Sequence, residues 1–265
     1  MQQVADPGPD PADGAPRPPA APLARLQSLL DDPRPPRRPL PGPRTRVRLA
    51  AAGGIVLGLG LLLAALVALA PEAVAALDVP AGRAFRDAAL AHPLLAGWAE
   101  AWSFAADGPR NVLAVAVVAV ALVRARAWPW AAFLVFTTQA GVLLSNILKL
   151  GIGRARPELV EQGAGQATLS FPSGHSFAGL TVWAGGAIVA LYVLPRRWGR
   201  LAAAGCLAVG LLQPPARLLL GRHWLSDTAG GQLLGLGWLL LCWAVFCTLL
   251  VRQGLAADPD GERGA

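Results

Sequence analysis

The hydrophobic residues of this chain gather in long uncharged blocks and do not alternate with polar residues. The block at residues 49–70 contains 22 residues without a charge, and as a helix it would be about 33 Å long. This length matches the hydrocarbon core of a bilayer, which is roughly 30 Å thick. Further apolar blocks follow at about 111–123, 128–148, 175–194, 200–216 and 228–251. The pattern therefore predicts an all-α integral-membrane helical bundle with about six transmembrane helices.

The segments on either side of these blocks have a different composition. Residues 1–43 carry thirteen of the 24 prolines, and such a segment has too little apolar surface to order itself. We expect a disordered tail over 1–43, a membrane domain over 44–252 and a second disordered tail over 253–265.

The connection at residues 71–110 is more polar than the blocks beside it. Aromatic and leucine side chains recur in it at four- to five-residue spacing, which is typical of a helix lying on the membrane surface. These side chains are Phe85, Leu90, Leu94, Trp98 and Trp102.

Composition supports a membrane protein and argues against nucleic-acid binding. The chain is 54% hydrophobic and 15% charged, with a net charge of +7. Its basic residues flank the apolar blocks or lie in the proline-rich tail, and no nucleic-acid-binding module is present, so anionic lipid headgroups explain the charge better. Cys206, Cys242 and Cys247 lie inside apolar blocks and are expected to be core residues.

The arginines predict an orientation. Six alternating spans place on one face Arg44, Arg46, Arg48, Arg124, Arg126, Arg196, Arg197, Arg200 and Arg252. The positive-inside rule assigns this face, and both termini, to the cytoplasm. A second basic set falls on the opposite, outer face and runs against the rule: Lys149, Arg154, Arg156, Arg217 and Arg222. We interpret this second set as functional.

Three polar pieces end on that outer face: KLGIGRARP (149–157), PSGH (172–175) and ARLLLGRHWLSD (216–227). Each has an ordinary structural interpretation by itself. Lys149 could extend to the headgroups, PSGH could be a turn with a helix cap, and His223 and Asp227 could be a structural pair at i,i+4 spacing. All three pieces at the same face favour a common site.

Phosphate chemistry suits this set of residues. Guanidinium groups match phosphate oxygens, and a Ser-Gly pair before a helix offers a hydroxyl and backbone N–H groups. A histidine oriented by an aspartate can act as a nucleophile, and a second histidine can protonate a leaving oxygen. No carboxylate cluster is available for Mg²⁺, so we expect neither a metal nor a cofactor, with fixed cations stabilising the charge.

The sequence resembles the type 2 phosphatidic acid phosphatase (PAP2) family, whose motifs are K-x6-R-P, P-S-G-H and S-R-x5-H-x3-D. Here the first motif is Lys149, six residues, then Arg156 and Pro157. The second is Pro172, Ser173, Gly174 and His175, and the third contains Arg217, His223 and Asp227. Ala216 departs from the family, which usually has serine there, so we expect a weakened hydrogen bond beside Arg217.

The resemblance implies a role for each matching residue. His223 attacks phosphorus and forms a phosphohistidine, Asp227 holds its imidazole, and His175 protonates the leaving oxygen. Lys149, Arg156, Arg217, Ser173 and Gly174 bind the phosphate oxygens. The implied activity is metal-independent hydrolysis of a lipid phosphomonoester or pyrophosphate at the outer face of the cell membrane. Polyprenyl diphosphate, phosphatidic acid and phosphatidylglycerol phosphate are candidate substrates.

Two alternatives remain open at the level of sequence. The same phosphohistidine could pass its phosphate to another lipid, as in a phosphotransferase. A non-catalytic protein that binds anionic lipids is favoured only by Ala216, and the intact His175, His223 and Asp227 argue against it. A soluble vanadium haloperoxidase, which shares the family's site plan, does not fit six membrane spans. No motif encodes the lipid tail or the oligomeric state.

Overall fold

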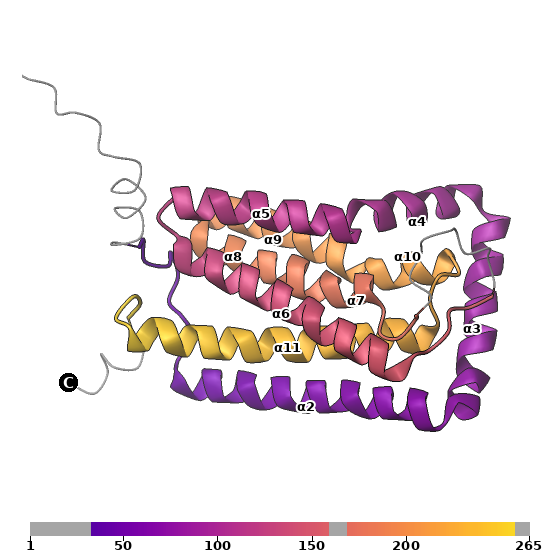
Figure 1. Cartoon of the computed structure of the whole chain (residues 1–265). Helices are drawn as coiled ribbons and strands as arrows, with labels where there is room; N and C mark the ends of the chain where they lie inside the picture. Colours follow the sequence, from indigo (N-terminus) through magenta and orange to yellow (C-terminus); the bar gives the residue numbers. More distant parts are fainter. Residues whose placement is uncertain (1–32, 159–168, 258–265) are drawn as a thin grey trace, which may run out of the picture.

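The computed structural model describes residues 33–158 and 169–257, and within these ranges the chain is helical (Figure 1). The helices are α2 (Pro43–Leu69), α3 (Pro71–Ala91), α4 (Pro93–Ala105), α5 (Gly108–Arg124), α6 (Trp128–Ile152), α7 (Gly174–Ala178), the π-helical turn η1 (Gly179–Ala184), α8 (Gly185–Val193), α9 (Arg196–Leu211), α10 (Gln213–Leu219) and α11 (Leu225–Arg252). The described ranges contain no strand, only one isolated β-bridge between Ala155 and Leu169.

Five helical stretches are long and apolar enough to cross a membrane. They are α2, α6, the run Gly174–Val193, the run Arg196–Leu219 and α11. A sixth crossing is formed if α4 and α5 are one span, bent by 49° where they meet. The predicted all-helical membrane bundle is confirmed, and the short apolar block at 111–123 is lengthened by α4.

The two ends of the bundle differ. At one end lie the start of α2, the α5–α6 turn, the α8–α9 turn and the end of α11, all of which carry the first arginine set (Figure 1). At the other end α3 lies across the bundle, close to α10 and the beginning of α11. The arginine sets therefore separate to opposite ends, as the alternation of spans requires.

The prediction of a single surface helix through Phe85 and Trp102 is wrong in one respect. The chain breaks at His92: α3 ends at Ala91, and α4 begins at Pro93 and turns back along the bundle toward α5 (Figure 1). Proline explains the break, because its fixed φ and missing N–H suit the first position of a new helix. Only Phe85 and Leu90 lie on the crossing helix, while Trp102 lies on α4.

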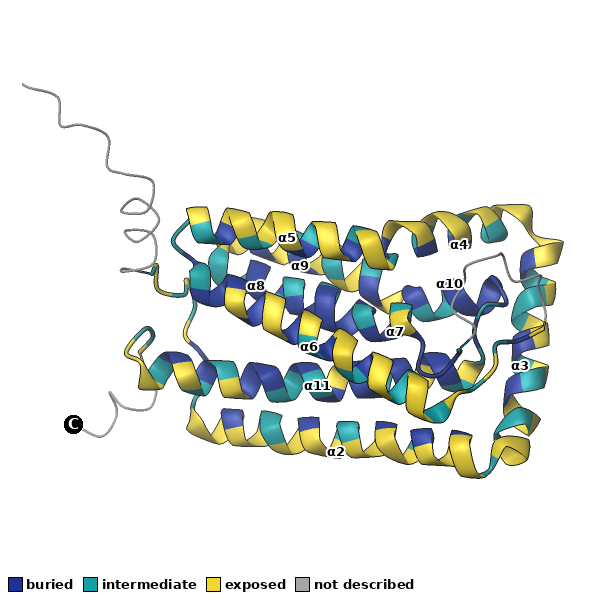
Figure 2. Cartoon of the chain, in the orientation of Figure 1, coloured by how far each residue is buried: buried dark blue, intermediate teal, exposed yellow. Residues whose placement is uncertain are grey.

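Burial follows the membrane setting (Figure 2). The outward faces of α2 and α5 are exposed although they are apolar, with Ile55 at 65% and Val117 at 60% exposure. Apolar side chains on the outside of a spanning helix are suited to lipid. The core lies between α5, α6, α8 and α11 and contains a cluster of rings including Trp130, Phe133 and Trp243.

The predicted tails are shorter than expected. Residues 33–42 are not helical, yet the Arg34 N–H donates to the Arg126 carbonyl at 2.7 Å and the Arg37 N–H to the Tyr192 carbonyl at 2.8 Å. Leu40 is 3% exposed and belongs to the core. A disordered segment over 33–43 is therefore wrong, because a buried leucine and backbone hydrogen bonds fix it to the bundle.

The C-terminal tail is shortened in the same way. It begins with a turn in which the Leu255 N–H donates to the Leu250 carbonyl at 2.9 Å, so residues 253–257 are ordered. The rest of both predicted tails, 1–32 and 258–265, lies outside the described residues. The three cysteines are free, with Cys242 and Cys247 buried and Cys206 half-buried, as expected of core residues.

Candidate active site

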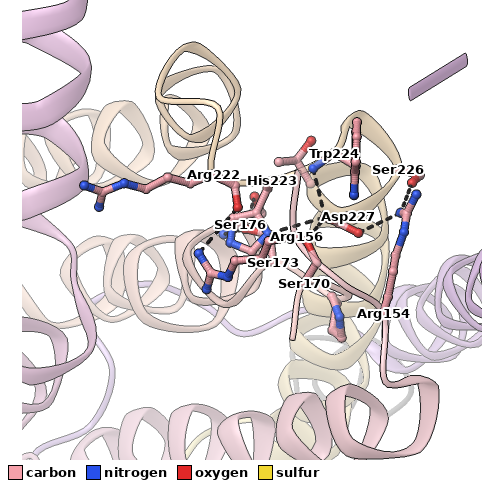
Figure 3. A network of polar contacts seen from close by, with 12 residues as sticks. Arg154, Arg156, Ser170, Ser173, Ser176, Arg222, His223, Trp224, Ser226 and Asp227 are labelled. Atoms are coloured by element: carbon pink, nitrogen blue, oxygen red, sulfur yellow. Dashed lines mark hydrogen bonds and ion pairs between the residues drawn. The ribbon is translucent and has the colours of Figure 1, made fainter. Parts of the chain in front are cut away.

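The three motif pieces meet at the end of the bundle where α3 crosses. Lys149 stands in the last turn of α6, Ser173 precedes α7, Arg217 lies in α10 and Asp227 lies in the first turn of α11. The start of α7 is fastened to α11, because the Ser173 N–H donates to the Asp227 carbonyl at 3.0 Å. Figure 3 shows this network, in which His223 and Arg156 lie near Asp227.

His223 and Asp227 form a buried pair. The Nδ1 atom of His223 is 3.5 Å from Oδ2 of Asp227. The same Oδ2 accepts the backbone N–H of Trp224 at 2.9 Å and the hydroxyl of Ser170, whose oxygen is 3.4 Å from Nδ1 of His223. Because Nδ1 faces the carboxylate, Nε2 is the nitrogen of His223 that is left for substrate.

The environment of His223 favours a neutral imidazole. Its side chain is only 2% exposed. Burial lowers the pKa of His223 to about 4, and the positive charge of Arg217 also lowers it. The hydrogen bond to Asp227 acts in the opposite direction and raises the pKa. A nucleophilic histidine must be unprotonated, and this site keeps His223 unprotonated at neutral pH.

Ser103, on α4, joins two of the predicted residues. The Nε2 atom of His175 is 3.2 Å from the Ser103 carbonyl oxygen, and Nη1 of Arg217 donates to the Ser103 hydroxyl at 2.7 Å. This bears on Ala216, which is fully buried among apolar side chains of α3, α4 and α10. The hydroxyl beside Arg217 that the family motif places at position 216 is supplied here by Ser103.

Lys149 holds the backbone that leads into α7. Its ammonium group donates to the carbonyls of Pro172 at 2.9 Å, Leu169 at 3.3 Å and Ser170 at 3.4 Å. It also lies within electrostatic range of Arg156, Arg217 and Asp227. This lysine is therefore both a nearby positive charge and a clamp on the PSGH segment.

Ser173 and Gly174 present donors at the beginning of a helix. The Ser173 oxygen accepts from the N–H of Ser176 at 3.5 Å and from its hydroxyl at 3.2 Å, so the proton of Ser173 itself stays available. Gly174 is exposed, and no atom lies within 4 Å of the place where a side chain would begin. This opening leaves room for an anion beside the backbone N–H groups.

A cavity and a groove adjoin the site. The cavity has a volume of about 980 Å³ and reaches Arg156, His175, Arg217 and Arg222. The groove, about 310 Å³, runs between α5 and α6 and reaches Lys149, Gly174 and His175. His175 lines both, so the two spaces meet at one predicted catalytic residue.

Two arginines at the cavity each have an N–H group without a hydrogen-bond partner in the described part of the chain. Within the described ranges, the Nε atoms of Arg156 and Arg217 are buried and have no hydrogen-bond partner. Arg156 is held by one bond, from Nη1 to the Arg222 carbonyl at 3.4 Å, and burial lowers its pKa, which the charge of Asp227 partly offsets. A guanidinium stays charged in proteins, so both arginines offer unsatisfied charged donors to an anion.

Several site residues were not predicted to belong to it. Ser103, Ser170, Asp78 and Ser226 carry no local signal, because each acts through a contact with a distant part of the chain. Arg154 did have a signal, as one of the basic residues on the unexpected face. No group of three His, Cys, Asp or Glu side chains suited to a metal occurs in the described part of the chain. The metal-independent reaction stays a prediction.

The comparisons with known proteins agree with this geometry. Residues 130–249 match the PAP2 superfamily. A lipid A 1-phosphatase from Rhizobium johnstonii is 37% identical over 141 residues, which cover 49% of this chain and 52% of that protein. One from Rhizobium etli is 37% identical over 145 residues, covering 50% and 56%. The chain thus spans about half the length of the curated relatives it matches.

A solved structure has the same fold. It is the PAP2 type phosphatidylglycerolphosphate phosphatase of Bacillus subtilis, a transmembrane protein, with a TM-score of 0.59 and 19% identity. The similarity covers 76% of this chain and 96% of that one. The segment 130–249, which contains all three motifs, is similar to the PAP2 superfamily.

Proposed function

We propose that this protein is a membrane phosphatase that hydrolyses a lipid phosphomonoester or pyrophosphate through a phosphohistidine. The observation that carries the proposal is the pair of buried, unpaired guanidinium N–H groups of Arg156 and Arg217, at the cavity that His175 lines. Buried charged donors without a partner are costly unless an anion satisfies them. A phosphate is an anion whose oxygens match both arginines.

The resemblance to the PAP2 family assigns each of the two histidines a step in the proposed reaction. Nε2 of His223 attacks phosphorus, the bond from phosphorus to the leaving oxygen breaks, and His175 donates a proton to that oxygen. Water then attacks the phosphohistidine, gives its proton to His175, and releases inorganic phosphate and the free His223. Asp227 holds the imidazole and stabilises its positive charge, while Lys149, Arg156 and Arg217 stabilise the charge on the equatorial oxygens.

The groove supports a lipid as substrate. It starts at Lys149 and His175 and continues between α5 and α6 along apolar side chains such as Val112, Val142 and Val182. A phosphate bound at the cations can therefore have its hydrocarbon part within the depth of the membrane. The active site is proposed to face outward, because the other end of the bundle carries the cytoplasmic arginine set.

The names of the relatives suggest which lipids to test first. Two relatives are lipid A 1-phosphatases and the solved structure is a phosphatidylglycerolphosphate phosphatase. The first panel therefore contains lipid A 1-phosphate, phosphatidylglycerol phosphate, phosphatidic acid and a polyprenyl diphosphate. Phosphate release by the full chain, purified in detergent, is measured with EDTA present.

The chain offers a matched control for the nucleophile. His223→Ala removes the proposed nucleophile, and His92→Ala removes an exposed histidine at the α3–α4 break. We expect release that persists in EDTA, disappears in His223→Ala and remains in His92→Ala. Full activity in His223→Ala would refute the phosphohistidine. Release that requires an added lipid alcohol as acceptor would instead identify a phosphotransferase.

A further inference from the structure

Arg154 is one of the six unspecified residues of the first family motif, and it touches Asp227 of the proposed catalytic pair. It follows α6 and precedes Arg156 by two residues. Its Nη1 atom donates to Oδ1 of Asp227 at 2.8 Å and to the hydroxyl of Ser226 at 2.6 Å. Figure 3 shows its guanidinium group directed at Asp227 and Ser226, on the far side of Asp227 from His223.

The two oxygens of Asp227 have different partners. Oδ2 faces His223 and accepts from Ser170 and Trp224. For Oδ1, Arg154 is the hydrogen-bond donor that the described part of the structure provides. Asp227 is completely buried, so loss of this donor would leave a charged oxygen without a hydrogen-bond partner. Arg154 therefore helps to fix the plane of the carboxylate that faces His223.

Asp78 holds Arg154 from the opposite side. It lies on α3, is 1% exposed, and its Oδ2 atom accepts from Nη2 of Arg154 at 2.6 Å. Its Oδ1 atom accepts the N–H of Ser226 at 2.8 Å, next to Asp227 in the first turn of α11. One guanidinium thus bridges two buried carboxylates, one from α3 and one from α11.

We propose that Arg154 is a positioning residue that fixes the carboxylate of Asp227 toward His223, and that Asp78 holds Arg154 in place. Through these bonds the crossing helix α3 becomes part of the frame of the active site. The proposal rests on the function proposed above, since it assigns Arg154 a role in that reaction.

The position of Arg154 predicts which kinetic constant it affects. Arg154 lines neither the cavity nor the groove, but a separate pocket of about 390 Å³ that it shares with Asp78, Arg156 and Trp224. It acts on the reaction through Asp227 alone, which predicts a lower kcat with little change in KM. Replacement of partners that orient a reactive group commonly lowers activity about 10- to 100-fold.

The first test is kinetic. Arg154→Met and Asp78→Asn are compared with Arg83→Met and Asp87→Asn, which remove exposed charges of the same signs from α3. We expect kcat to fall about 10- to 100-fold in Arg154→Met, with KM within about threefold of wild type. Arg154→Lys should recover part of the loss, since a lysine keeps the positive charge but lacks the planar group whose separate nitrogens reach Asp78 and Asp227. The controls should match wild type.

The second test reads His223 directly and needs no turnover. The chain has three histidines, so histidine-labelled protein in detergent gives few NMR signals. The groups that set the pKa of His223 include Asp227 on α11, Arg217 on α10 and Arg156 after α6, and all of them remain in Arg154→Met. Loss of the Asp227 hydrogen bond, which raises the pKa of His223, should lower that pKa in Arg154→Met, whereas loss of a positive charge with Asp227 still in place would raise it.

The outcomes separate the two proposals. An unchanged kcat in folded Arg154→Met, compared with an active wild type, overturns the positioning role. A lower kcat with an unchanged or raised pKa of His223 also overturns it, because the carboxylate of Asp227 would then still face His223. If wild type releases no phosphate but the pKa of His223 falls in Arg154→Met, the proposed function fails while the placement of Asp227 by Arg154 holds.

Discussion

Gly231 is the residue at which a single methyl group should test the geometry of the site. It lies on α11, one turn after Asp227, against the segment that leads into His175. A Cβ atom placed there would be 2.7 Å from the Ser173 carbonyl oxygen and 3.1 Å from the Phe177 nitrogen. Both are backbone atoms, so neither can move aside by rotating a side chain. Gly231→Ala must therefore separate α11 from the start of α7.

The size of the displacement follows from these distances. Ordinary contact begins at 3.4 Å, so the carbonyl at 2.7 Å must retreat by about 0.7 Å. The Ser173 N–H bond to the Asp227 carbonyl spans the same gap, so His175 moves relative to Asp227. A misplacement of about 1 Å can cost 100-fold in rate, which predicts a fall of about 10- to 100-fold in kcat for Gly231→Ala.

The assay is phosphate release from the best lipid of the panel, with thermal unfolding in detergent to confirm that the variant is folded. Gly58→Ala is the control, because no atom lies within 4 Å of a Cβ at Gly58 on α2. It should behave as wild type. A folded Gly231→Ala protein with wild-type kcat would refute the argument that this contact sets the position of His175.

Three further predictions follow from single contacts. Ser103→Ala removes the hydroxyl that accepts from Arg217 at 2.7 Å, and since such a charged bond is worth about 1.5–3 kcal/mol, kcat/KM should fall at least tenfold; an unchanged kcat/KM would show that the hydroxyl is dispensable. Val142→Trp fills the groove and should lower kcat/KM for a long-chain lipid at least about tenfold, but not for a water-soluble phosphate ester, and equal losses for both would contradict a groove for the tail. Folding lowers the pKa of His223 to about 4, so the unfolded chain binds more protons than the folded chain between about pH 6.5 and 4. The free energy of unfolding should therefore fall as the pH drops through that range. Thermal unfolding of His223→Gln should show less of this fall, and an identical pH dependence would contradict it.

The membrane fold is largely predictable from the sequence because the bilayer requires long apolar segments. Uncharged blocks of the length of α2 and α11 have no good alternative to spanning a membrane. The α4–α5 crossing was harder to predict, since its apolar run is broken by the turn at residues 106–107 and only three-dimensional packing shows that both halves run in one direction. The ordered strap at 33–42 was missed because its proline content outweighed one leucine, Leu40, whose burial depends on distant partners.

The reactive residues were predictable for a different reason. His175, His223 and Asp227 match short motifs of the PAP2 family, so the resemblance identifies them as the proposed reactive residues. Their supports are not spaced in this way. Asp78 and Arg154 are 76 positions apart and Ser103 and Arg217 are 114 positions apart, and no local pattern relates such partners.

Two of the residues that support the proposed site lie outside the segment that matches the superfamily. The superfamily match covers residues 130–249, which contain every motif residue, whereas Asp78 and Ser103 come from α3 and α4 before it. Yet Ser103 contacts both His175 and Arg217, and Asp78 holds the arginine that holds Asp227. The matched segment therefore supplies the atoms that react, while α3 and α4 fix how those atoms are placed. Substitutions of Asp78 and Ser103 should accordingly change kcat while every family motif remains intact.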